Sequence, residues 1–558
     1  MPRLSLPRLQ YTLPGLTGAF LFALVSLTPS LLPRAALFQG FVTGISAAIG
    51  YGLGVLLAWL WRAFANREIA PTKKWHWRTL GAVALVGIAV ASAFSTREQN
   101  EIRELMGTGQ ASAWRFLTVP LISALIFIIL IGLGRALRRV SRWLGAQLTR
   151  VIGPQAAKAS AVLVVSVLTF LALSGLVFDN GVEAVDSSFA LGDVQISSTA
   201  KPPTSEFRSG SEASIVKWED LGRQGRRFVG LGPTAAQIAE FTGRDSLEPI
   251  RAYAGTANAE EVEDRAALAV DDLERAGGFE RGSLLVAGST GSGFIEPSAS
   301  NSFEYLTGGD SAIVSIQYSH LPSWASFLVD QTAARNAGRA LFDEVYERWL
   351  KLPVDSRPKL YVFGESLGSF AMETAFSGEA DLRNRTSGAL LVGPPNFNEL
   401  YTEFRSNRDA GSREIEPVFR DGRTIRFANN PWTSIPPSTQ PWNDPRMLYL
   451  VHPSDPITWW SPDLIWHEPD WLKEQRGDDV SASMRWYPIV TFWQTSADMA
   501  VAMGTPPGHG HNFVGEHVAG WAQILQPAGW TEKDLLRLQD QLVEEAAEFA
   551  GVPPSLQE

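Results

Sequence analysis

A segment in the second half of the chain combines the residue types that nucleophilic catalysis requires. Residues 359–376 read KLYVFGESLGSFAMETAF, so a short β-favouring run leads through GESLG into a pattern with helical spacing. A strand, a glycine-framed turn and a helix expose a serine hydroxyl at a helix N-terminus, where the helix dipole favours negative charge. Because a bare G-x-S-x-G motif also arises by chance in glycine-rich chains, the flanking strand and helix carry the prediction that Ser366 is a nucleophile.

A serine nucleophile needs a histidine base and a carboxylate that orients the imidazole ring. Asp455 directly follows the last clear strand, and prolines on both sides of it indicate a rigid turn. This position predicts Asp455 as the orienting acid. Asp444 and Asp463 are nearby alternatives, and an ordinary Asx turn at Asp455 is another interpretation.

The histidine base is expected in GHGHNF, residues 508–513, a glycine-rich loop before a predicted helix. We prefer His511 to His509 because His511 lies nearer that helix and its neighbours can hold its ring. Two histidines at i and i+2 could instead bind a metal, but no third ligand is evident, so we expect no metal site. His452 is predicted to be structural, and His517 to lie on the surface of the following helix.

A second glycine-rich loop, GSTGSG at 288–293, follows another predicted strand. It lacks the G-x-G-x-x-G spacing and the P-loop lysine of nucleotide-binding loops, and no cofactor is expected. We interpret it as an oxyanion loop, with backbone N–H groups from Ser289 or Thr290 and from Leu367 holding the developing charge. An ordinary glycine-rich turn remains the alternative.

The elements that must position these residues alternate between strands and helices. Strands are predicted at 249–255, 284–287, 313–318, 360–363, 389–392 and 447–451, and helices at 260–275, 325–352 and 516–525. Such alternation predicts a doubly wound, mostly parallel sheet, in which functional groups lie at the carboxyl ends of the strands. The chain order Ser366, Asp455, His511 is that of α/β-hydrolases, and it differs from the orders in chymotrypsin and subtilisin.

The stretch between the fifth strand and the acid is unusually long. Residues 396–444 are predicted to form a lid insertion, with a hairpin at 418–427 that turns at Asp421 and Gly422. Downstream, tryptophans crowd one segment. They predict either a buried aromatic cluster or an apolar acyl pocket or membrane-interface rim.

The first third of the chain has a different composition. Five apolar runs occupy residues 13–32, 38–61, 80–94, 116–133 and 159–178. Four are long enough to cross a bilayer, which takes about 20 residues, whereas 80–94 is short. The series predicts a five-helix transmembrane bundle, and a cleaved signal peptide cannot account for five runs.

The distribution of basic residues predicts the orientation of this bundle. With the N-terminus inside, the loops around 62–78 and 135–158 are cytoplasmic and hold most of the Lys and Arg residues of the region, in accord with the positive-inside rule. The outer segments hold few, among them Arg34 and Arg115. Everything after residue 178 is therefore expected outside the cytoplasm.

Charge and cysteine content exclude several classes of function. Residues 1–178 carry a net charge of +13, whereas the chain as a whole carries −10, so the C-terminal part is strongly acidic. That part is not expected to bind nucleic acid. The chain contains no Cys, which excludes disulfides, thiolate metal sites and cysteine catalysis.

Several motifs together resemble a known family, the actinobacterial membrane-anchored α/β-hydrolases with an N-terminal multi-helix domain and an extracytoplasmic hydrolase domain. The similar motifs are SLTPSLLPR at 26–34, IGYGLG at 49–54, WEDLGRQGRRF at 218–228, GESLG at 364–368 and GHGHNF at 508–513. The resemblance covers nearly the whole chain and implies the fold, serine chemistry and a cell-envelope setting, where lipid esters are abundant.

The sequence thus predicts a transmembrane domain (1–178), a linker (179–214) and an α/β-hydrolase domain (215–558). The predicted function is that of a membrane-anchored serine esterase or acyltransferase, with a lipid or acyl-ester substrate and no nucleic-acid partner; protein partners are not predicted. A catalytically silent receptor or scaffold, or a transport accessory, is the alternative.

Overall fold

The computed structural model describes residues 11–65, 72–171, 200–321, 326, 331–433 and 439–549. It divides into two compact units, each built from two stretches of chain. We call Met1–Val177 with Trp460–Pro506 the helical unit, and Phe178–Trp459 with Pro507–Glu558 the sheet unit. The division differs from the expected domains in one respect, because Trp460–Pro506 packs with the N-terminal helices. Residues 179–199 of the expected linker lie outside the described residues.

Seven strands form the sheet of the sheet unit, in the order β1-β3-β2-β4-β5-β7-β6. Every neighbouring pair is parallel. The strands are β1 Ile250–Ala254, β2 Ser283–Gly288, β3 Ser311–Ile316, β4 Lys359–Glu365, β5 Gly388–Val392, β6 Ile425–Ala428 and β7 Arg446–Leu450. Nearly all of their residues are buried, as expected for a parallel sheet that is covered on both faces.

Strand β6 is the element that the sequence reasoning missed, and the predicted hairpin at 418–427 is wrong. The chain does turn at Asp421, whose φ is 57°. After the turn, however, Ile425–Ala428 pairs in parallel with β7 instead of folding back on the preceding residues. Pairing with β7 lets three of the four β6 residues become buried. A lid within 396–444 stays a prediction, and residues 434–438 of this stretch lie outside the described residues.

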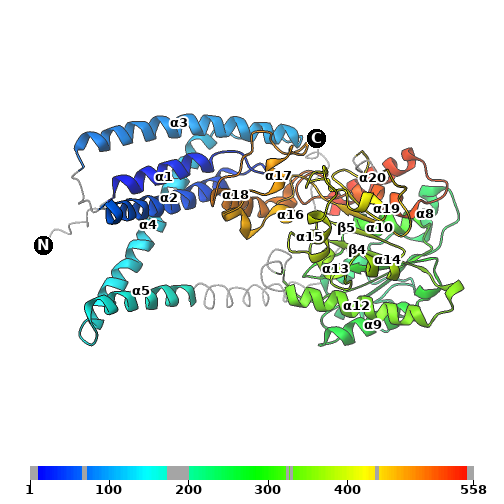
Figure 1. Cartoon of the computed structure of the whole chain (residues 1–558). Helices are drawn as coiled ribbons and strands as arrows, with labels where there is room; N and C mark the ends of the chain where they lie inside the picture. The colour runs from blue at the N-terminus through cyan, green and yellow to red at the C-terminus, as the bar shows by residue number, and fades with distance from the viewer. Residues whose placement is uncertain are drawn as a thin grey trace. The chain divides into compact units, whose positions relative to one another are not determined.

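Helices cover both faces of the sheet (Figure 1). Helices α9, α12 and α13 pack on one face, α10, α19 and α20 pack together on the other, and α7 packs against the edge strand β1. The helices of the sheet unit are α7 Gly222–Gly230, α8 Ala235–Thr242, α9 Val262–Arg275, α10 Pro297–Leu306, α12 Gln331–Lys351, α13 Leu367–Glu373, α14 Glu379–Arg385, α15 Glu399–Ser406, α16 Pro456–Trp459, α19 Glu516–Leu525 and α20 Glu532–Phe549. The expected doubly wound architecture is therefore present.

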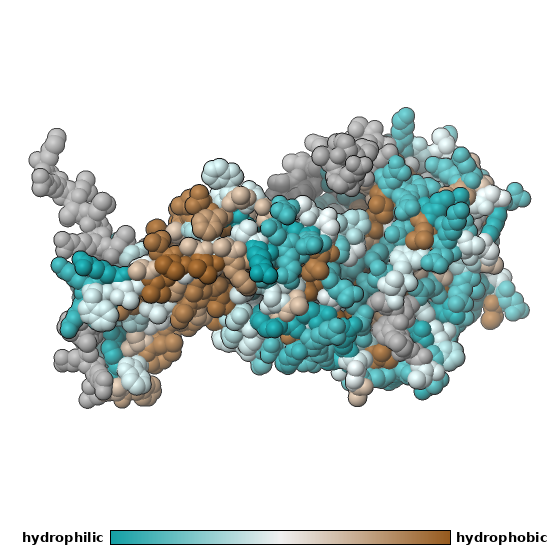
Figure 2. Space-filling model, turned by 90° about the horizontal axis from the view of Figure 1, so that it is seen from above, coloured by the Kyte–Doolittle hydropathy of each residue, from teal (hydrophilic) through white to brown (hydrophobic). Residues whose placement is uncertain are grey.

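The helical unit begins with five helices, four of which are long and apolar enough to cross a membrane. The helices are α1 Leu13–Ser26, α2 Ala36–Ala65, α3 Lys74–Leu105, α4 Arg115–Leu148 and α5 Pro154–Leu171, and Trp460–Pro506 adds the short α17 Asp470–Lys473 and α18 Val490–Met499. Figure 2 shows hydrophobic residues gathered on the surface of this part of the chain. Many large apolar side chains of α2, α3 and α4 are exposed there, which is typical of a lipid-facing surface.

Two of the predicted spans differ in length from the expectation. The run at 13–32 gives a helix of only 14 residues, about 21 Å long, because Pro29 follows closely and cannot continue a helix. The short run at 80–94 lies instead inside α3, which has 32 residues because helix-forming polar residues extend it at both ends. The run at 80–94, which is short in the sequence, thus lies in a long helix, and the run at 13–32 gives the short helix.

Glycines allow α1 and α2 to approach each other closely. A Cβ atom added to Gly50 would lie 2.4 Å from the carbonyl oxygen of Gly18, and one added to Gly54 would lie 2.3 Å from that of Pro14. Only glycine leaves room for backbone contact at these positions, as in other tightly packed membrane helices. This packing gives the IGYGLG motif at 49–54 a structural reason.

A buried ion pair links Trp460–Pro506 to the loop between α1 and α2. Arg34 Nε lies 3.1 Å from Asp498 Oδ1, and both side chains are fully buried. Asp498 also accepts hydrogen bonds from the Ser30 hydroxyl and the Leu31 N–H. Burial raises the pKa of the Asp498 carboxyl to about 6, although the charge of Arg34 opposes this shift.

Candidate active site

Ser366 occupies a sharp turn between β4 and α13. Its backbone has φ 55° and ψ −124°, a strained combination for a residue other than glycine. A Cβ atom on Gly364 would lie 2.3 Å from the Gly368 carbonyl oxygen, and one on Gly368 would lie 2.3 Å from the Gly288 carbonyl oxygen. Both glycines of the motif are therefore required by close backbone packing, which is the geometry predicted for a nucleophile turn.

The predicted acid and base are hydrogen-bonded to each other. Asp455 Oδ2 lies 2.7 Å from His511 Nδ1, and both side chains are buried. The other carboxylate oxygen, Oδ1, accepts the Ile457 N–H. Burial lowers the pKa of the His511 imidazole, but the charge and hydrogen bond of Asp455 outweigh it, so the pKa is raised above its ordinary value.

The His511 ring lies beside the turn that carries Ser366. A Cβ atom on Gly393, the residue after β5, would lie 2.6 Å from His511 Cε1. The preceding residue, Val392, accepts a hydrogen bond of 2.9 Å from the Ser366 N–H. His511 Nε2 is buried and has no hydrogen-bond partner within the described residues. The nitrogen that would take a proton from a nucleophile is therefore unengaged.

Buried contacts fix the loop that carries His511. His452 Nε2 lies 2.7 Å from Glu516 Oε2, and its Nδ1 lies 2.9 Å from the Gly510 carbonyl oxygen. The His452 ring stacks on Phe513 at a centroid distance of 3.9 Å. Trp459, one of the crowded tryptophans, is buried and donates to the His452 carbonyl. These contacts give His452 the structural position expected for it.

The alternative acids, Asp444 and Asp463, and the alternative base, His509, are not part of the buried Asp455–His511 pair. Asp444 is largely exposed and lies 3.5 Å from Arg446. Asp463 is exposed and belongs to the helical unit. His509 is partly exposed, and its backbone bridges to Asn512. Of the two loop histidines, His511 is the one hydrogen-bonded to Asp455.

A second set of buried polar groups lies beneath the turn, and sequence reasoning missed it. His517 was expected on a helix surface, but it is fully buried, with Nε2 2.8 Å from Glu365 Oε2 and Nδ1 2.7 Å from the Ser298 hydroxyl. Burial and the charge of Glu365 raise the pKa of neighbouring Glu296 to about 7. The spacing of His517, Trp521 and Ile524 at i, i+4 and i+7 places them on one helical face, which could have predicted this burial.

A buried carboxylate on α13 also escaped the sequence reasoning. Glu373 accepts hydrogen bonds from the Asn398 amide, the Tyr449 hydroxyl and the backbone N–H groups of Leu400 and Tyr401. Burial raises its pKa to about 7, and these four donors oppose the shift. Glu373 therefore ties the helix after Ser366 to the start of α15.

The predicted oxyanion loop lies next to the Ser366 turn. Gly288 at the end of β2 pairs in register with Gly364 on β4. Leu367 is the first residue of α13, a position whose N–H has no partner within the helix. The Thr290 N–H, however, donates to the Phe294 carbonyl at 3.0 Å. This bond engages the Thr290 amide, so Ser289 is the better candidate of the two that the sequence left open.

The described residues contain no group of three or more His, Asp or Glu side chains arranged to hold a metal ion. The remaining tryptophans do not form one cluster. Trp471 is buried, Trp466 is largely exposed, and Trp460 donates a hydrogen bond to Ser496. Trp460 and Trp493 each contact the ring of Phe492, so two of these tryptophans belong to a small aromatic cluster.

Comparison with protein families gives two matches that together span most of the chain. Residues 250–538 match a model described as an alpha/beta-hydrolase family, and residues 27–233 match a model described as the N-terminus of an alpha/beta-hydrolase family. A search of curated proteins and a search of solved structures gave no significant match.

Proposed function

Because the chain belongs to the α/β-hydrolase family, we propose that it is a membrane-anchored serine hydrolase that cleaves or transfers an acyl group. The observation that carries this proposal is the combination of a strained Ser366 turn with a buried Asp455–His511 pair beside it. Backbone strain of this kind clusters at active sites, ligand clamps and switch regions.

In the proposed reaction, the Ser366 hydroxyl oxygen attacks the carbonyl carbon of an ester while its proton passes to His511 Nε2. The raised pKa of the His511 imidazole suits it to take this proton, and Asp455 holds the ring and stabilises the imidazolium. The N–H groups of Leu367 and Ser289 receive the oxyanion, and each such donor lowers the barrier by about 3 kcal/mol.

Collapse of the tetrahedral intermediate expels the alcohol, which takes the proton back from His511. The acyl group then remains on Ser366 as an ester. Water or an acceptor alcohol attacks this ester with His511 again as base, and the acyl group leaves as an acid or as a new ester. The choice between the two outcomes distinguishes an esterase from an acyltransferase.

The substrate that we propose is a lipid or acylated ester of the cell envelope. The exposed apolar surfaces of α2, α3 and α4 support a membrane location, and the basic loops support an extracytoplasmic sheet unit. A C-terminal alkaline phosphatase fusion should therefore be active, whereas a C-terminal green fluorescent protein fusion should be dark. The reverse pattern would refute this orientation.

A fluorophosphonate probe tests the chemistry directly, because it reacts with activated serines. The full-length protein in detergent should be labelled, and Ser366→Ala should abolish labelling. Ser356→Ala is the matched control, since Ser356 is an exposed serine in the same unit, and it should label normally. Absence of labelling in the wild-type protein would instead favour a catalytically silent receptor, scaffold or transport accessory.

A further inference from the structure

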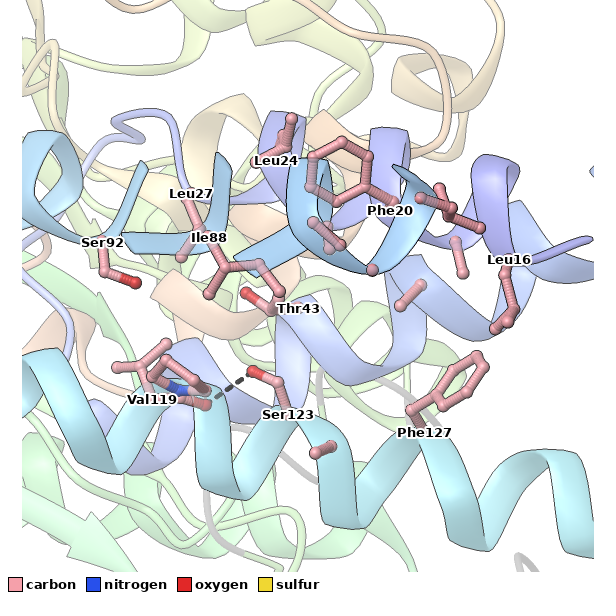
Figure 3. A pocket seen from close by; sticks show the side chains of 18 of the residues that line it. Leu16, Phe20, Leu24, Leu27, Thr43, Ile88, Ser92, Val119, Ser123 and Phe127 are labelled. Atoms are coloured by element: carbon pink, nitrogen blue, oxygen red, sulfur yellow. Dashed lines mark hydrogen bonds between the residues drawn. The ribbon is translucent and has the colours of Figure 1, made fainter. Parts of the chain in front are cut away.

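Buried groups that could assist the proposed reaction lie near Ser366, in the sheet unit. The cavity of about 320 Å³ between α1, α2, α3 and α4 of the helical unit offers no such group, because no titratable side chain lines it. Figure 3 shows apolar side chains pointing into that cavity, among them Leu16, Phe20 and Phe127. The sheet unit, in contrast, places the buried carboxyl group of Glu365 directly before the nucleophile.

The direction of the Glu365 side chain follows from its place in the sheet. Glu365 is the last residue of β4, and because side chains alternate along a strand, it lies on the same face as Phe363. The His517 ring of α19 packs on Phe363 at a centroid distance of 5.8 Å, and its Nε2 lies 2.8 Å from Glu365 Oε2. The Glu365 carboxylate therefore points to the face of the sheet that α19 covers.

A chain of hydrogen bonds holds this carboxylate in place. An ionised carboxylate only accepts hydrogen bonds, so His517 Nε2 is the donor to Glu365, and Nδ1 of a neutral His517 ring is an acceptor. The Ser298 hydroxyl lies 2.7 Å from that Nδ1 and can donate to it, while the Ser298 oxygen accepts the Gly515 N–H at 3.3 Å. Because His517 and Ser298 are almost fully buried and their hydrogen bonds are satisfied, the network is suited to keep Glu365 in one position.

His511 approaches the same end of the sheet from the loop before α19. Glu365 pairs in register with Val392 on β5, and a Cβ atom on the next residue, Gly393, would lie 2.6 Å from His511 Cε1. The strand end that carries Glu365 and the one that contacts His511 are thus neighbours. Among the residues that the structure describes, His517 is the only ion-pair partner of Glu365, so no Arg or Lys side chain there neutralises its charge. A charge acts more strongly on its neighbours in a buried site than in water.

Several charges together determine how readily His511 holds a proton. Burial lowers the pKa of the His511 imidazole, Asp455 and then Glu365 raise it, and His452 lowers it, with a net result above the ordinary value. Asp455 acts through a direct hydrogen bond, whereas no hydrogen bond joins Glu365 to His511 among the described residues. The other titratable groups around these side chains are Glu516, which bonds to His452, together with His517 and Glu296.

We propose that Glu365 is a second positioning residue of the reaction: held by His517, its carboxylate stabilises the positive charge that His511 gains when it takes the Ser366 proton. Asp455 stabilises the same charge by direct contact, and Glu365 does so across space. This inference rests on the proposed serine chemistry. Absence of labelling in the wild-type protein would remove that chemistry itself, whereas a labelled wild-type protein whose pH profile does not depend on the charge at position 365 would overturn only the inference.

The test is the pH profile of the rate of fluorophosphonate labelling, measured on the full-length protein in detergent. Glu365→Gln keeps the size of the side chain and an oxygen that accepts from His517, but it removes the charge. Its labelling midpoint should fall by roughly one pH unit, the lower end of the shift that a nearby charge produces, because His511 then loses its proton at a lower pH. Glu365→Asp keeps the charge and shortens the side chain, so it should keep most of the wild-type midpoint.

Glu373→Gln is the matched control, because it also removes a buried carboxylate of the sheet unit, one that is bonded to Asn398 and Tyr449. It should keep the wild-type midpoint even though it lowers stability. Glu365→Ala is a second uncharged variant and should lower the midpoint as Glu365→Gln does, so the test remains decisive if one of the two fails to fold. An unchanged midpoint in the uncharged variants would overturn the proposal. An equal fall in Glu365→Asp, or in the control, would overturn it too, because the charge at position 365 would then not be the cause.

Discussion

The buried Arg34–Asp498 pair leads to a prediction whose size follows from the structure. Both side chains are fully buried, and burial raises the pKa of the Asp498 carboxyl to about 6 despite the adjacent arginine. The cost of removing the two charges from water therefore exceeds their attraction. Removing one partner leaves the other charge buried and unpaired, which costs about 3–5 kcal/mol. Removing both charges should cost much less.

We expect Arg34→Met and Asp498→Leu each to lower the midpoint of thermal unfolding by roughly 10 °C, since about 1 kcal/mol corresponds to 2–4 °C in a unit of this size. The double variant should recover most of the loss. A part should remain, because the Leu31 N–H would lose the Asp498 carboxylate as its hydrogen-bond acceptor. Intrinsic tryptophan fluorescence of the detergent-solubilised protein during heating measures these midpoints.

The control for this cycle is Lys473→Met. It breaks the exposed Lys473–Asp470 pair in the same unit and should change stability by less than about 1 kcal/mol. Additive losses in the double variant would refute the reasoning, because they would mean that the two charges do not compensate each other. Losses in the single variants as small as that of the control would also refute it.

Three further predictions concern the sheet unit. Glu373→Gln should destabilise it by about 1–3 kcal/mol in denaturant titration, because an amide cannot accept from all four donors that Glu373 satisfies; a change below 0.5 kcal/mol would contradict this. Fluorophosphonate labelling should fall as pH decreases and His511 becomes protonated, with a midpoint above the ordinary histidine pKa. Asp455→Asn should lower that midpoint and slow labelling strongly. An unshifted midpoint would contradict the expected effect of Asp455 on the pKa of His511. Gly368→Ala should abolish labelling, because its Cβ would lie 2.3 Å from the Gly288 carbonyl oxygen, and normal labelling would argue against the turn geometry.

Local patterns predicted much of the sheet unit. Six of seven strands lie where buried β-favouring runs predict them, and Asp455 follows β7, at the carboxyl edge of the sheet where functional groups are expected. His511 reaches Asp455 from the loop before α19. Strand β6 was missed because its short run follows an Asp-Gly turn that is equally suited to a hairpin. Whether it folds back or pairs with β7 is decided by tertiary pairing, which a local pattern does not contain.

The place of Trp460–Pro506 could not be predicted for a related reason. It lies between Asp455 and His511 in the sequence, so it was assigned with them to the C-terminal domain. Its attachment to the helical unit depends on single polar residues such as Asp498, Gln494 and Ser481, which bond to the α1–α2 loop and to the end of α3. Such contacts leave no periodic signal. In the sequence, nothing distinguishes Asp498 from other acidic residues on helices, because its partner Arg34 is distant along the chain.

These contacts also bear on how many helices cross the membrane. Trp460–Pro506 contacts Ser30, which precedes α2, and Glu101, which lies at the end of α3. The start of α2 and the end of α3 therefore lie on the same side of the helical unit. If α2 to α5 all cross the membrane, the four spans begin and end on that same side, whether or not the 14-residue α1 also crosses. Whether α1 crosses therefore decides only on which side of the membrane the N-terminus lies. The segments on the opposite side hold few Lys and Arg residues, Arg34 among them, so the basic loops at 62–78 and 135–158 favour an orientation in which these two loops are cytoplasmic.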